Sequence, residues 1–459
     1  DFKLCKLYPA KIALPATVTE LMMRSSAAVR CKSRIPVLTW RNPSNGATIC
    51  RAGLYTSQGT SSRSPDDEEL LLHIIRCSTT GTRDKTTRVY HILDASEKPK
   101  NQSSLKVDDD LRVEYENLEL ESLSSMRESF RRLYKLCVNA SASSDEHWLM
   151  LLDQTRWLEH IRALLRASLK GLLMVLLGES ILVCCQDGMD RTCQVSSLVQ
   201  LMADPYYRTV DGLCVLIEKD WLSFGYPFSD RCGFQADNND GDRYPIFLQW
   251  LDAVWQLTQQ FPCAFQFNEA LLLHIMSHVY SGLFGTFLCN NDKERRKVLL
   301  RVSTISLWTE IAEHRELYVN PFYTPTDDML KPCTTMRALS LWHSYYLRYY
   351  EEPIVKQMVQ MVKVPEKQKR SSHLSALAAV QPAMATIQSA RPLATRTTPP
   401  NSSEENSFRS DSPNLAHRNA QLERNNQKLL RQLERMTKKV KATTSSHRGE
   451  KRKKGSGDG

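Results

Sequence analysis

The sequence lacks paired cysteines at the spacings that zinc sites use. Its thirteen cysteines are scattered through apolar segments such as Val183–Cys185, which is typical of reduced thiols rather than of a disulfide framework. It also lacks an opening secretory signal and a run long enough to span a membrane, because the most apolar stretch, 171–185, is interrupted by Gly178 and Glu179. We therefore expect a cytoplasmic protein.

An initiator methionine is missing as well. The chain opens at Asp1 in what resembles the middle of a domain, so we expect a fragment of a longer protein. Its 459 residues and 41% hydrophobic content suffice for one large domain or two ordinary ones.

Excess positive charge is missing from most of the chain, although the formal net charge is +10. Residues 367–459 hold 19 Lys and Arg against 7 Asp and Glu, a net +12, which leaves 42 against 44, a net −2, for the rest. The basic character therefore belongs to the tail, and we expect no nucleic-acid partner.

Residues 1–365 alternate apolar strands with amphipathic helices, which predicts one large α/β domain. Asn45-Gly46 between two apolar runs indicates a hairpin, since both residue types tolerate positive φ. The aromatic stripe of 246–261 is interpreted as core rather than as cofactor contacts. The other predicted elements are a strand at 89–93, a helix from Trp157, a strand at 181–184, and a helix from near Thr192 to before Pro205.

The C-terminal part falls into three predicted segments. Residues 366–413 are rich in Ser, Thr, Ala and Pro without periodicity, which indicates a disordered linker. Residues 414–441 carry heptads, with Asn419 and Asn426 at a positions, and predict a two-stranded coiled coil; a solitary solvated helix is the alternative. Residues 442–459 form a basic tail, interpreted as solvated, with attraction to an anionic membrane as the minority interpretation.

One loop contains the candidate catalytic residues. Cys185 and Arg191 lie six residues apart, a spacing that arises readily by chance. Its context is more specific, because a buried strand precedes Cys185, Gly188 allows a tight turn, and a helix starts directly behind Arg191. In that arrangement backbone N–H groups and the helix N-terminus converge on one anion.

These residue types suit phosphoryl transfer. The helix field favours a thiolate nucleophile at Cys185, and Arg191 can hold two phosphoryl oxygens. Asp190 and Asp187 are candidates for the acid that protonates the leaving alkoxide, and Asp190 is preferred because it adjoins the arginine. The structural alternative is a buried inert thiol with the two aspartates as helix N-caps.

The loop also resembles a known signature. Residues Cys185 to Thr192 are similar to the Cys-Ser-Asp-Gly-Trp-Asp-Arg-Thr sequence of the myotubularin family of phosphoinositide 3-phosphatases. The resemblance runs from Asp1 to about Tyr349. Further similar segments are 204–209, 218–225, 260–265, 267–269 and 284–290.

The resemblance implies a cysteine-dependent, dual-specificity-like phosphatase fold without metal or cofactor. It implies removal of the 3-phosphate from phosphatidylinositol 3-phosphate and the 3,5-bisphosphate on endosomal membranes, an upstream lipid-binding domain of PH-GRAM type, and a coiled coil that forms homo- or heterodimers with another myotubularin. The residues carried over are Cys185 as nucleophile, Asp190 as acid, Arg191 as phosphate anchor, Gln186, Asp187, Gly188 and Met189 as substrate-binding loop, and Arg231 near the headgroup.

The sequence also departs from the family pattern. Cys184, Gln186 and Met189 replace the family's His, Ser and Trp in the loop. Outside it, Tyr226-Pro227 replaces a His and a basic residue, Ser122-Leu123-Ser124 replaces Asn-Ile-His, and a Gly-rich stretch has no counterpart. Two interpretations follow: an active lipid phosphatase, or an impaired adaptor that pairs with an active relative. Protein-tyrosine phosphatase activity is a weaker third.

Overall fold

The structure is a computed structural model, and it describes residues 2–56, 64–79, 88–97, 111–138, 145–234 and 240–348. The chain divides into two compact units, Asp1–Val364 and Pro365–Gly459, and every described residue belongs to the first. The linker at 366–413, the coiled coil at 414–441 and the tail at 442–459 lie outside the described residues and stay predictions.

A five-stranded sheet lies at the centre of the first unit, with the order β1-β2-β5-β3-β4. β1 is antiparallel to β2, whereas β2, β5, β3 and β4 run parallel. The strand bounds are β1 Val37–Arg41, β2 Thr48–Gly53, β3 Arg88–Asp94, β4 Leu111–Asn117 and β5 Ser180–Cys185. The central place of β5 explains why all six of its residues are buried and apolar or small.

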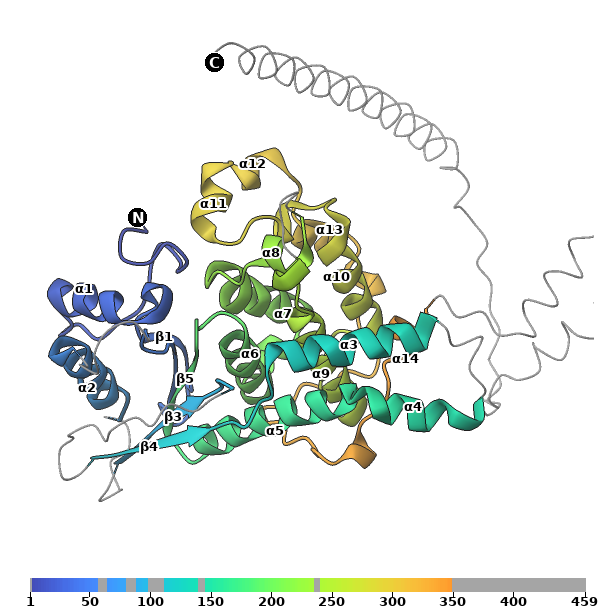
Figure 1. Ribbon diagram of the computed structural model, residues 1–459, viewed down its shortest axis with the longest axis horizontal. Coiled ribbons are helices and arrows are strands. Elements are labelled where there is room, and N and C mark those ends of the chain that lie inside the picture. Colours follow the sequence, from blue (N-terminus) through green and yellow to red (C-terminus); the bar gives the residue numbers. More distant parts are fainter. Residues whose placement is uncertain are drawn as a thin grey trace, which may run out of the picture. The chain divides into compact units, whose positions relative to one another are not determined.

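Helices make up most of the remaining described chain (Figure 1). Among them, none combines the length and the apolar character that a membrane crossing requires. Their bounds are α1 Glu20–Val29, α2 Pro65–Thr79, α3 Leu123–Val138, α4 Trp148–Thr155, α5 Trp157–Leu176, α6 Arg191–Ala203, α7 Val210–Leu216, α8 Phe228–Cys232, α9 Ile246–Gln260, α10 Glu269–Ser281, α11 Asp292–Lys297, α12 Leu300–Ser303, α13 Leu307–Glu313 and α14 His343–Tyr346.

The sheet separates two hydrophobic clusters. Side chains alternate along a strand, so Leu182 and Cys184 of β5 face the cluster that α1 and α2 cover. Ile181, Val183 and Cys185 face the larger cluster, which α5, α6 and α9 form. Figure 1 shows α1 and α2 on one side of the strands and α5 and α6 on the other. Cys185 therefore ends its strand on the side of the large helical layer.

Most of the predicted elements are confirmed. The predicted strands at 89–93 and 181–184 correspond to β3 and β5, and the helices predicted from Trp157, from near Thr192 and over 246–261 correspond to α5, α6 and α9. The α9 stripe is core, as interpreted, with Trp250 and Val254 fully buried.

The predicted hairpin is confirmed as β1–β2. Gly46 has positive φ in its turn, and the Asn45 side chain donates to the carbonyl of Val175 at 2.8 Å, which ties the loop to α5. One expectation needs correction. The alternation of strands and helices was expected through residue 365, yet every described strand precedes Gln186. After that point the apolar stripes of α9 and α10 are buried by α6 and by each other, so no further sheet covers them in the described part of the chain.

Candidate active site

The candidate site lies where three parallel strands end. Gly53 of β2 pairs with Cys185 of β5, and Asp94 of β3 pairs with Cys184. Ligands of open parallel sheets bind at this carboxyl edge. α6 starts at Arg191, so Cys185 lies in front of the helix N-terminus, as the sequence predicts. Its side chain is 7% exposed.

Gly188 makes the sharp turn of the loop possible. Its φ is +63°, and a Cβ at this position would lie 2.7 Å from the carbonyl oxygen of Ala52. The Gly188 N–H donates to the Cys185 carbonyl at 3.1 Å. Any side chain would meet both the conformational cost of positive φ and a clash with β2, so this position requires glycine.

Arg51 of β2 holds the loop from behind. It is fully buried, and its Nη2 donates to the Gly188 carbonyl at 3.3 Å and to the Cys193 thiol at 2.9 Å. Its Nη1 donates to Asp220, at 2.8 Å to the carbonyl and 3.1 Å to Oδ1. In a trans peptide the C=O and the following N–H point in opposite directions. Arg51 therefore turns the N–H of Met189 away from β2.

Thr192 contacts the thiol directly. Its Oγ1 donates to the Cys185 Sγ at 3.1 Å, and the Thr192 side chain is fully buried. A hydroxyl donor at this distance stabilises the sulfur anion more than the neutral thiol. This hydrogen bond argues against the interpretation of Cys185 as an inert structural thiol.

Arg191 is fixed along one edge. Its Nη1 donates to the carbonyls of Leu120 at 2.7 Å and Ala95 at 3.3 Å, whereas Nε and Nη2 donate to no residue that the structure describes. Burial lowers the pKa of Arg191 from its ordinary value, although the nearby Cys185 and Asp190 act in the opposite direction. The second edge of the guanidinium is thus available to an anion in front of Cys185.

Asp190 does not cap α6. It occupies the N-cap position, but its side chain makes no capping hydrogen bond. Instead it accepts two bonds from Arg231 of α8, from Nε at 3.0 Å and from Nη2 at 2.9 Å. Burial acts to lower the pKa of Arg231, but the charge of Asp190 outweighs it and raises that pKa. For Asp190, the helix-cap alternative is therefore wrong.

The side chains converge on one cavity of about 710 Å³. Of the predicted site residues, Gln186, Asp187 and Arg231 line it beside Cys185, Asp190 and Arg191. Gly188 and Met189 belong to the loop but do not line the cavity, and the Met189 side chain is buried. The remaining lining residues are Ala95, Ser96, Glu97, Leu123, Ser124, Asp242 and Tyr244.

One loop thus brings a thiol, a tight glycine turn and an arginine together at the cavity. A family model described as the myotubularin-like phosphatase domain matches residues 1–296. The chain belongs to the myotubularin family. The resemblance seen in the sequence is thus confirmed.

Individual myotubularins are similar over a longer stretch. The chain is 39% identical over 356 residues to myotubularin of Xenopus tropicalis, covering 76% of this chain and 58% of that protein. It is 38% identical over 358 residues to the Mus musculus protein named phosphatidylinositol-3,5-bisphosphate 3-phosphatase MTMR2, covering 76% and 54%. Myotubularin of Rattus norvegicus is 38% identical over 358 residues. The chain thus spans a little over half the length of these relatives.

The residues that depart from the myotubularin pattern lie partly in the core and partly in the cavity lining. Tyr226 is 1% exposed and packs edge-on against Trp221 and Phe228, so it serves the core and not the cavity. Ser124 and Leu123 do line the cavity. Its charged lining comprises four acids, Glu97, Asp187, Asp190 and Asp242, and two cations, Arg191 and Arg231.

Sequence reasoning missed several residues of this myotubularin site. From the sequence, Thr192 marks only the start of a helix, although it directly follows Arg191 in the signature. Arg51 is detectable as a lone charge inside the apolar run 47–54, since a buried charge in a strand requires a partner. Glu97 follows β3, whereas Asp242 and Tyr244 lie together in the segment before α9, and no local pattern marks any of the three.

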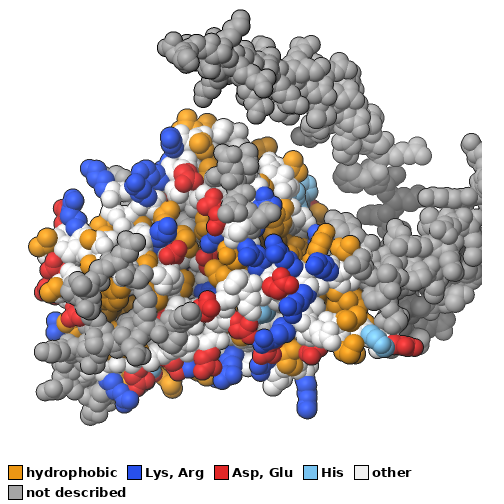
Figure 2. Space-filling model, viewed as in Figure 1, with side chains coloured by type: hydrophobic (Ala, Val, Ile, Leu, Met, Phe, Trp, Pro, Cys, Tyr) orange, Lys and Arg blue, Asp and Glu red, His pale blue; other side chains and the backbone are white. Residues whose placement is uncertain are grey.

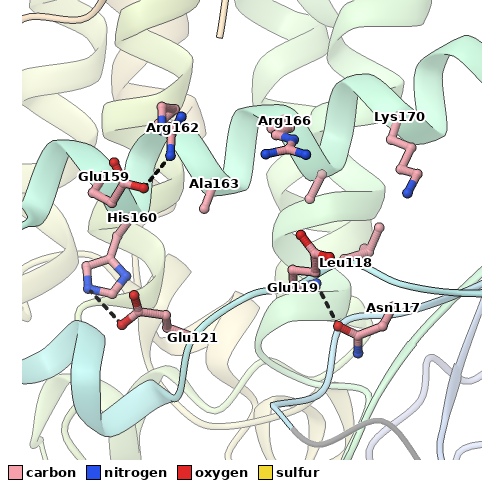
Figure 3. Close-up of a pocket in the computed structure, with 11 residues that line it drawn as sticks. Asn117, Leu118, Glu119, Glu121, Glu159, His160, Arg162, Ala163, Arg166 and Lys170 are labelled. Atoms are coloured by element: carbon pink, nitrogen blue, oxygen red, sulfur yellow. Dashed lines mark hydrogen bonds and ion pairs between the residues drawn. The ribbon is translucent and has the colours of Figure 1, made fainter. Parts of the chain in front are cut away.

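A second cavity lies next to this myotubularin site, between α5 and residues 117–121 (Figure 3). Figure 3 shows Arg162, Arg166 and Lys170 in a row along α5 above that segment. Arg162 pairs with Glu159, and Lys170 pairs with Glu116. Among the described residues, no cysteine or hydroxyl side chain lines this cavity of about 250 Å³, so it offers no side chain of the kind that the cavity at Cys185 presents.

Proposed function

We propose that this chain is a phosphoinositide phosphatase that removes the 3-phosphate from phosphatidylinositol 3-phosphate and its 3,5-bisphosphate. The single observation that carries the proposal is the Cys185 thiol, hydrogen-bonded by Thr192 and facing the same cavity as Arg191. The name of the mouse relative, a 3,5-bisphosphate 3-phosphatase, supports the substrate class. We place the reaction on the cytoplasmic face of endosomal membranes, in line with the family resemblance.

The proposed reaction has two displacements. The Cys185 thiolate attacks phosphorus, a sulfur–phosphorus bond forms, and the bond between phosphorus and the inositol 3-oxygen breaks. The leaving alkoxide takes a proton from an acid. Water then attacks the cysteinyl-phosphate, which releases inorganic phosphate and restores the thiolate. Arg191 and the N–H groups of the loop and helix start hold the phosphoryl oxygens throughout.

The geometry bears most directly on which side chain donates the proton to the leaving alkoxide. Asp190 is engaged by two bonds from Arg231. To serve as the acid, its carboxyl group has to release Arg231 and turn toward the leaving oxygen. Asp187, half-buried in the same lining, is the alternative donor.

A second candidate function is an impaired phosphatase that acts as an adaptor for an active myotubularin. The observation that favours it is the cavity lining, in which acids outnumber cations and Arg231 is already engaged by Asp190. An anionic headgroup binds weakly in such surroundings, and misplacement lowers rates steeply. The predicted coiled coil at 414–441 would supply the pairing.

Phosphate release from soluble short-chain phosphatidylinositol 3-phosphate tests the first candidate. The parent protein is expected to turn over and Cys185→Ser to lose all activity, while Cys214→Ser, which changes a buried thiol of α7 away from the loop, is the matched control. Equal activity in Cys185→Ser would remove Cys185 as the nucleophile.

The adaptor candidate has a separate test. The full chain and a form with Leu422→Asp and Leu429→Asp would be compared by light scattering, alone and mixed with an active myotubularin. Pairing that depends on these leucines, together with no turnover by the parent, would favour the adaptor. A strictly monomeric parent would count against it.

A further inference from the structure

The segment between Asn290 and Leu307 forms a short helical hairpin, made of α11 and α12. Its base is fixed by buried contacts. Arg295 is 8% exposed and donates to Glu218 at 3.0 Å and to the Thr286 carbonyl at 3.4 Å, and Leu300 is buried. Residues 293–305 apart from the buried Arg295 and Leu300 are called the tip below.

The tip exposes an unusual amount of apolar surface. Val302 is 86% exposed, Leu299 and Ile305 are 66% exposed, and Val298 is also exposed. Gly285 donates its N–H to the Ile305 carbonyl at 3.0 Å, and Leu283, two residues before it in the chain, is also exposed. Single exposed apolar side chains are ordinary, but a contiguous group marks an interaction surface.

The backbone conformation that exposes the Leu299 side chain is energetically unfavourable. Leu299 has φ +53° and ψ +38°, which is the left-handed region that glycine or asparagine adopts most easily. A leucine at this position is neither buried nor required by the turn. Strain of this kind is found where the side chain has a task that the folded monomer alone does not show.

Cations surround the apolar side chains. Lys293, Arg296, Lys297 and Arg301 are all exposed. Arg296 lies 3.6 Å from the Asp292 carboxylate and Arg301 lies 3.5 Å from that of Glu218, whereas no ion pair joins Lys293 or Lys297 to another described residue. The two acids of the segment point inward: Asp292 is 8% exposed, and Glu294 accepts bonds from Asn290 and Asn291 at the helix start. Figure 2 shows orange side chains at the upper edge of the view, over α11 and α12, with blue ones beside them.

The tip is linked to the active site. Asn290, directly before α11, exchanges two hydrogen bonds with Asp230: the Asp230 N–H donates to Oδ1 at 3.2 Å, and Nδ2 donates to the Asp230 carboxylate at 2.9 Å. The next residue along α8 is Arg231, which lines the cavity. The start of α11 is thus joined by hydrogen bonds to the residue directly before a lining residue of the cavity.

We propose that the tip docks on an anionic lipid bilayer, with Val298, Leu299 and Val302 entering the acyl boundary. Lys293, Arg296, Lys297 and Arg301 then lie among the anionic headgroups, where each cation adds attraction. A second copy of the chain fits less well, because a symmetric contact would bring the same four cations against one another. The proposal rests on the proposed function only in that such an enzyme has to reach its lipid.

Sedimentation of the full chain with vesicles tests this proposal without any turnover. The vesicles contain phosphatidylcholine with or without phosphatidylserine, and no phosphoinositide. Val302→Asp is expected to weaken binding to the anionic vesicles by about tenfold. Leu149→Asp, on α4 and 77% exposed in the parent, is the matched control and is expected to bind like the parent.

The charge contribution is tested in the same way. Lys297→Gln is expected to weaken binding by about fivefold, with a smaller effect at high salt, whereas Lys135→Gln on α3 is expected to leave it unchanged. Equal binding by Val302→Asp and the parent overturns the proposal. So does an equal loss in Leu149→Asp, or a change from dimer to monomer in Val302→Asp without vesicles, which would make the tip an interface between copies.

Two further measurements keep the outcomes separate. Melting temperature shows whether Val302→Asp is folded, and Val302→Ser serves as a milder replacement that still removes the apolar group. Hydrolysis of soluble short-chain phosphatidylinositol 3-phosphate reports on the proposed function alone. Vesicle binding without hydrolysis refutes only the proposed phosphatase activity. Hydrolysis without vesicle binding refutes only the proposed docking of the tip on the bilayer.

Discussion

Arg231 and Asp190 form a two-bond ion pair across the mouth of the cysteine loop, with Nε to Oδ1 at 3.0 Å and Nη2 to Oδ2 at 2.9 Å. The residue expected to protonate the leaving group is thereby joined to the residue expected to meet the inositol headgroup. Substrate has to compete with this pair. The pair consequently sets the positions of both side chains before the reaction starts.

A double-mutant cycle measures this coupling. Asp190→Asn and Arg231→Gln are each expected to lower kcat/KM on short-chain phosphatidylinositol 3-phosphate by about a hundredfold, as expected for loss of a general acid or of a positioned cation. Because the two side chains act as one unit, the double variant should lose much less than the product of the single losses. Arg132→Gln, on the exposed face of α3 and outside the cavity lining, is the control. If the loss of kcat/KM in the double variant equals the product of the two single losses, the two side chains act independently.

The hydrogen bond from Thr192 to the Cys185 thiol makes a second prediction. Thr192→Val keeps the shape of the side chain and removes the hydroxyl, so kcat should fall by about tenfold to a hundredfold, the value of a hydrogen bond to a charged group. KM should stay within about twofold, because the lost bond acts on sulfur and not on the headgroup. Thr192→Ser, which keeps the hydroxyl, should retain most of the activity. A serine variant as slow as the valine variant would assign the loss to packing.

Arg51 is expected to act as a positioning residue for the loop. Arg51→Lys keeps the charge but cannot reach Gly188, Cys193 and Asp220 together, so it should cost about 2 kcal/mol of unfolding free energy. At a temperature where the variant is folded, turnover should fall by at least about tenfold because the Met189 N–H loses its orientation.

The matched control for Arg51 is Arg34. This arginine is also fully buried and donates to the carbonyls of Phe224 and Gly225, at 2.7 and 3.0 Å, without contacting the loop. Arg34→Lys should lower the melting temperature to a similar degree and leave turnover by the folded protein unchanged. Equal losses of turnover in both variants would contradict the positioning role.

Asp252 in α9 predicts a pH dependence of stability. Burial raises its pKa from 3.8 to about 6, against the opposing hydrogen bonds from Gln256, Trp157 and Tyr346. Between these two values the unfolded chain has lost the proton and the folded chain keeps it, so stability falls as pH rises through this window. The loss from this group amounts to about 3 kcal/mol.

Melting temperatures from pH 4 to pH 7 check this sign. The asparagine in Asp252→Asn does not titrate, so the difference in stability between variant and parent should move in favour of the variant as pH rises. A difference that stays constant over this range would show that Asp252 does not titrate there.

The sequence by itself determined the local part of the site. The strand at β5, the turn at Gly188 and the helix behind Arg191 are adjacent in the chain, and apolar periodicity together with one glycine is enough to predict their order. The family signature falls on the same residues. Cys185 and Arg191 can therefore be identified from the sequence alone.

Only the tertiary structure decided what surrounds that loop. Asp190 and Arg231 lie 41 residues apart in sequence, and Arg51 and Gly188 lie 137 apart. Hydrogen-bond partners across such distances depend on which strands and helices pack together. The periodicity of apolar residues predicts the elements but not which of them are in contact. The exposure of Val302 and Leu299 also depends on the tertiary structure. Whether an apolar side chain is buried or exposed is set by the elements that pack over it, and the sequence does not show which elements do so.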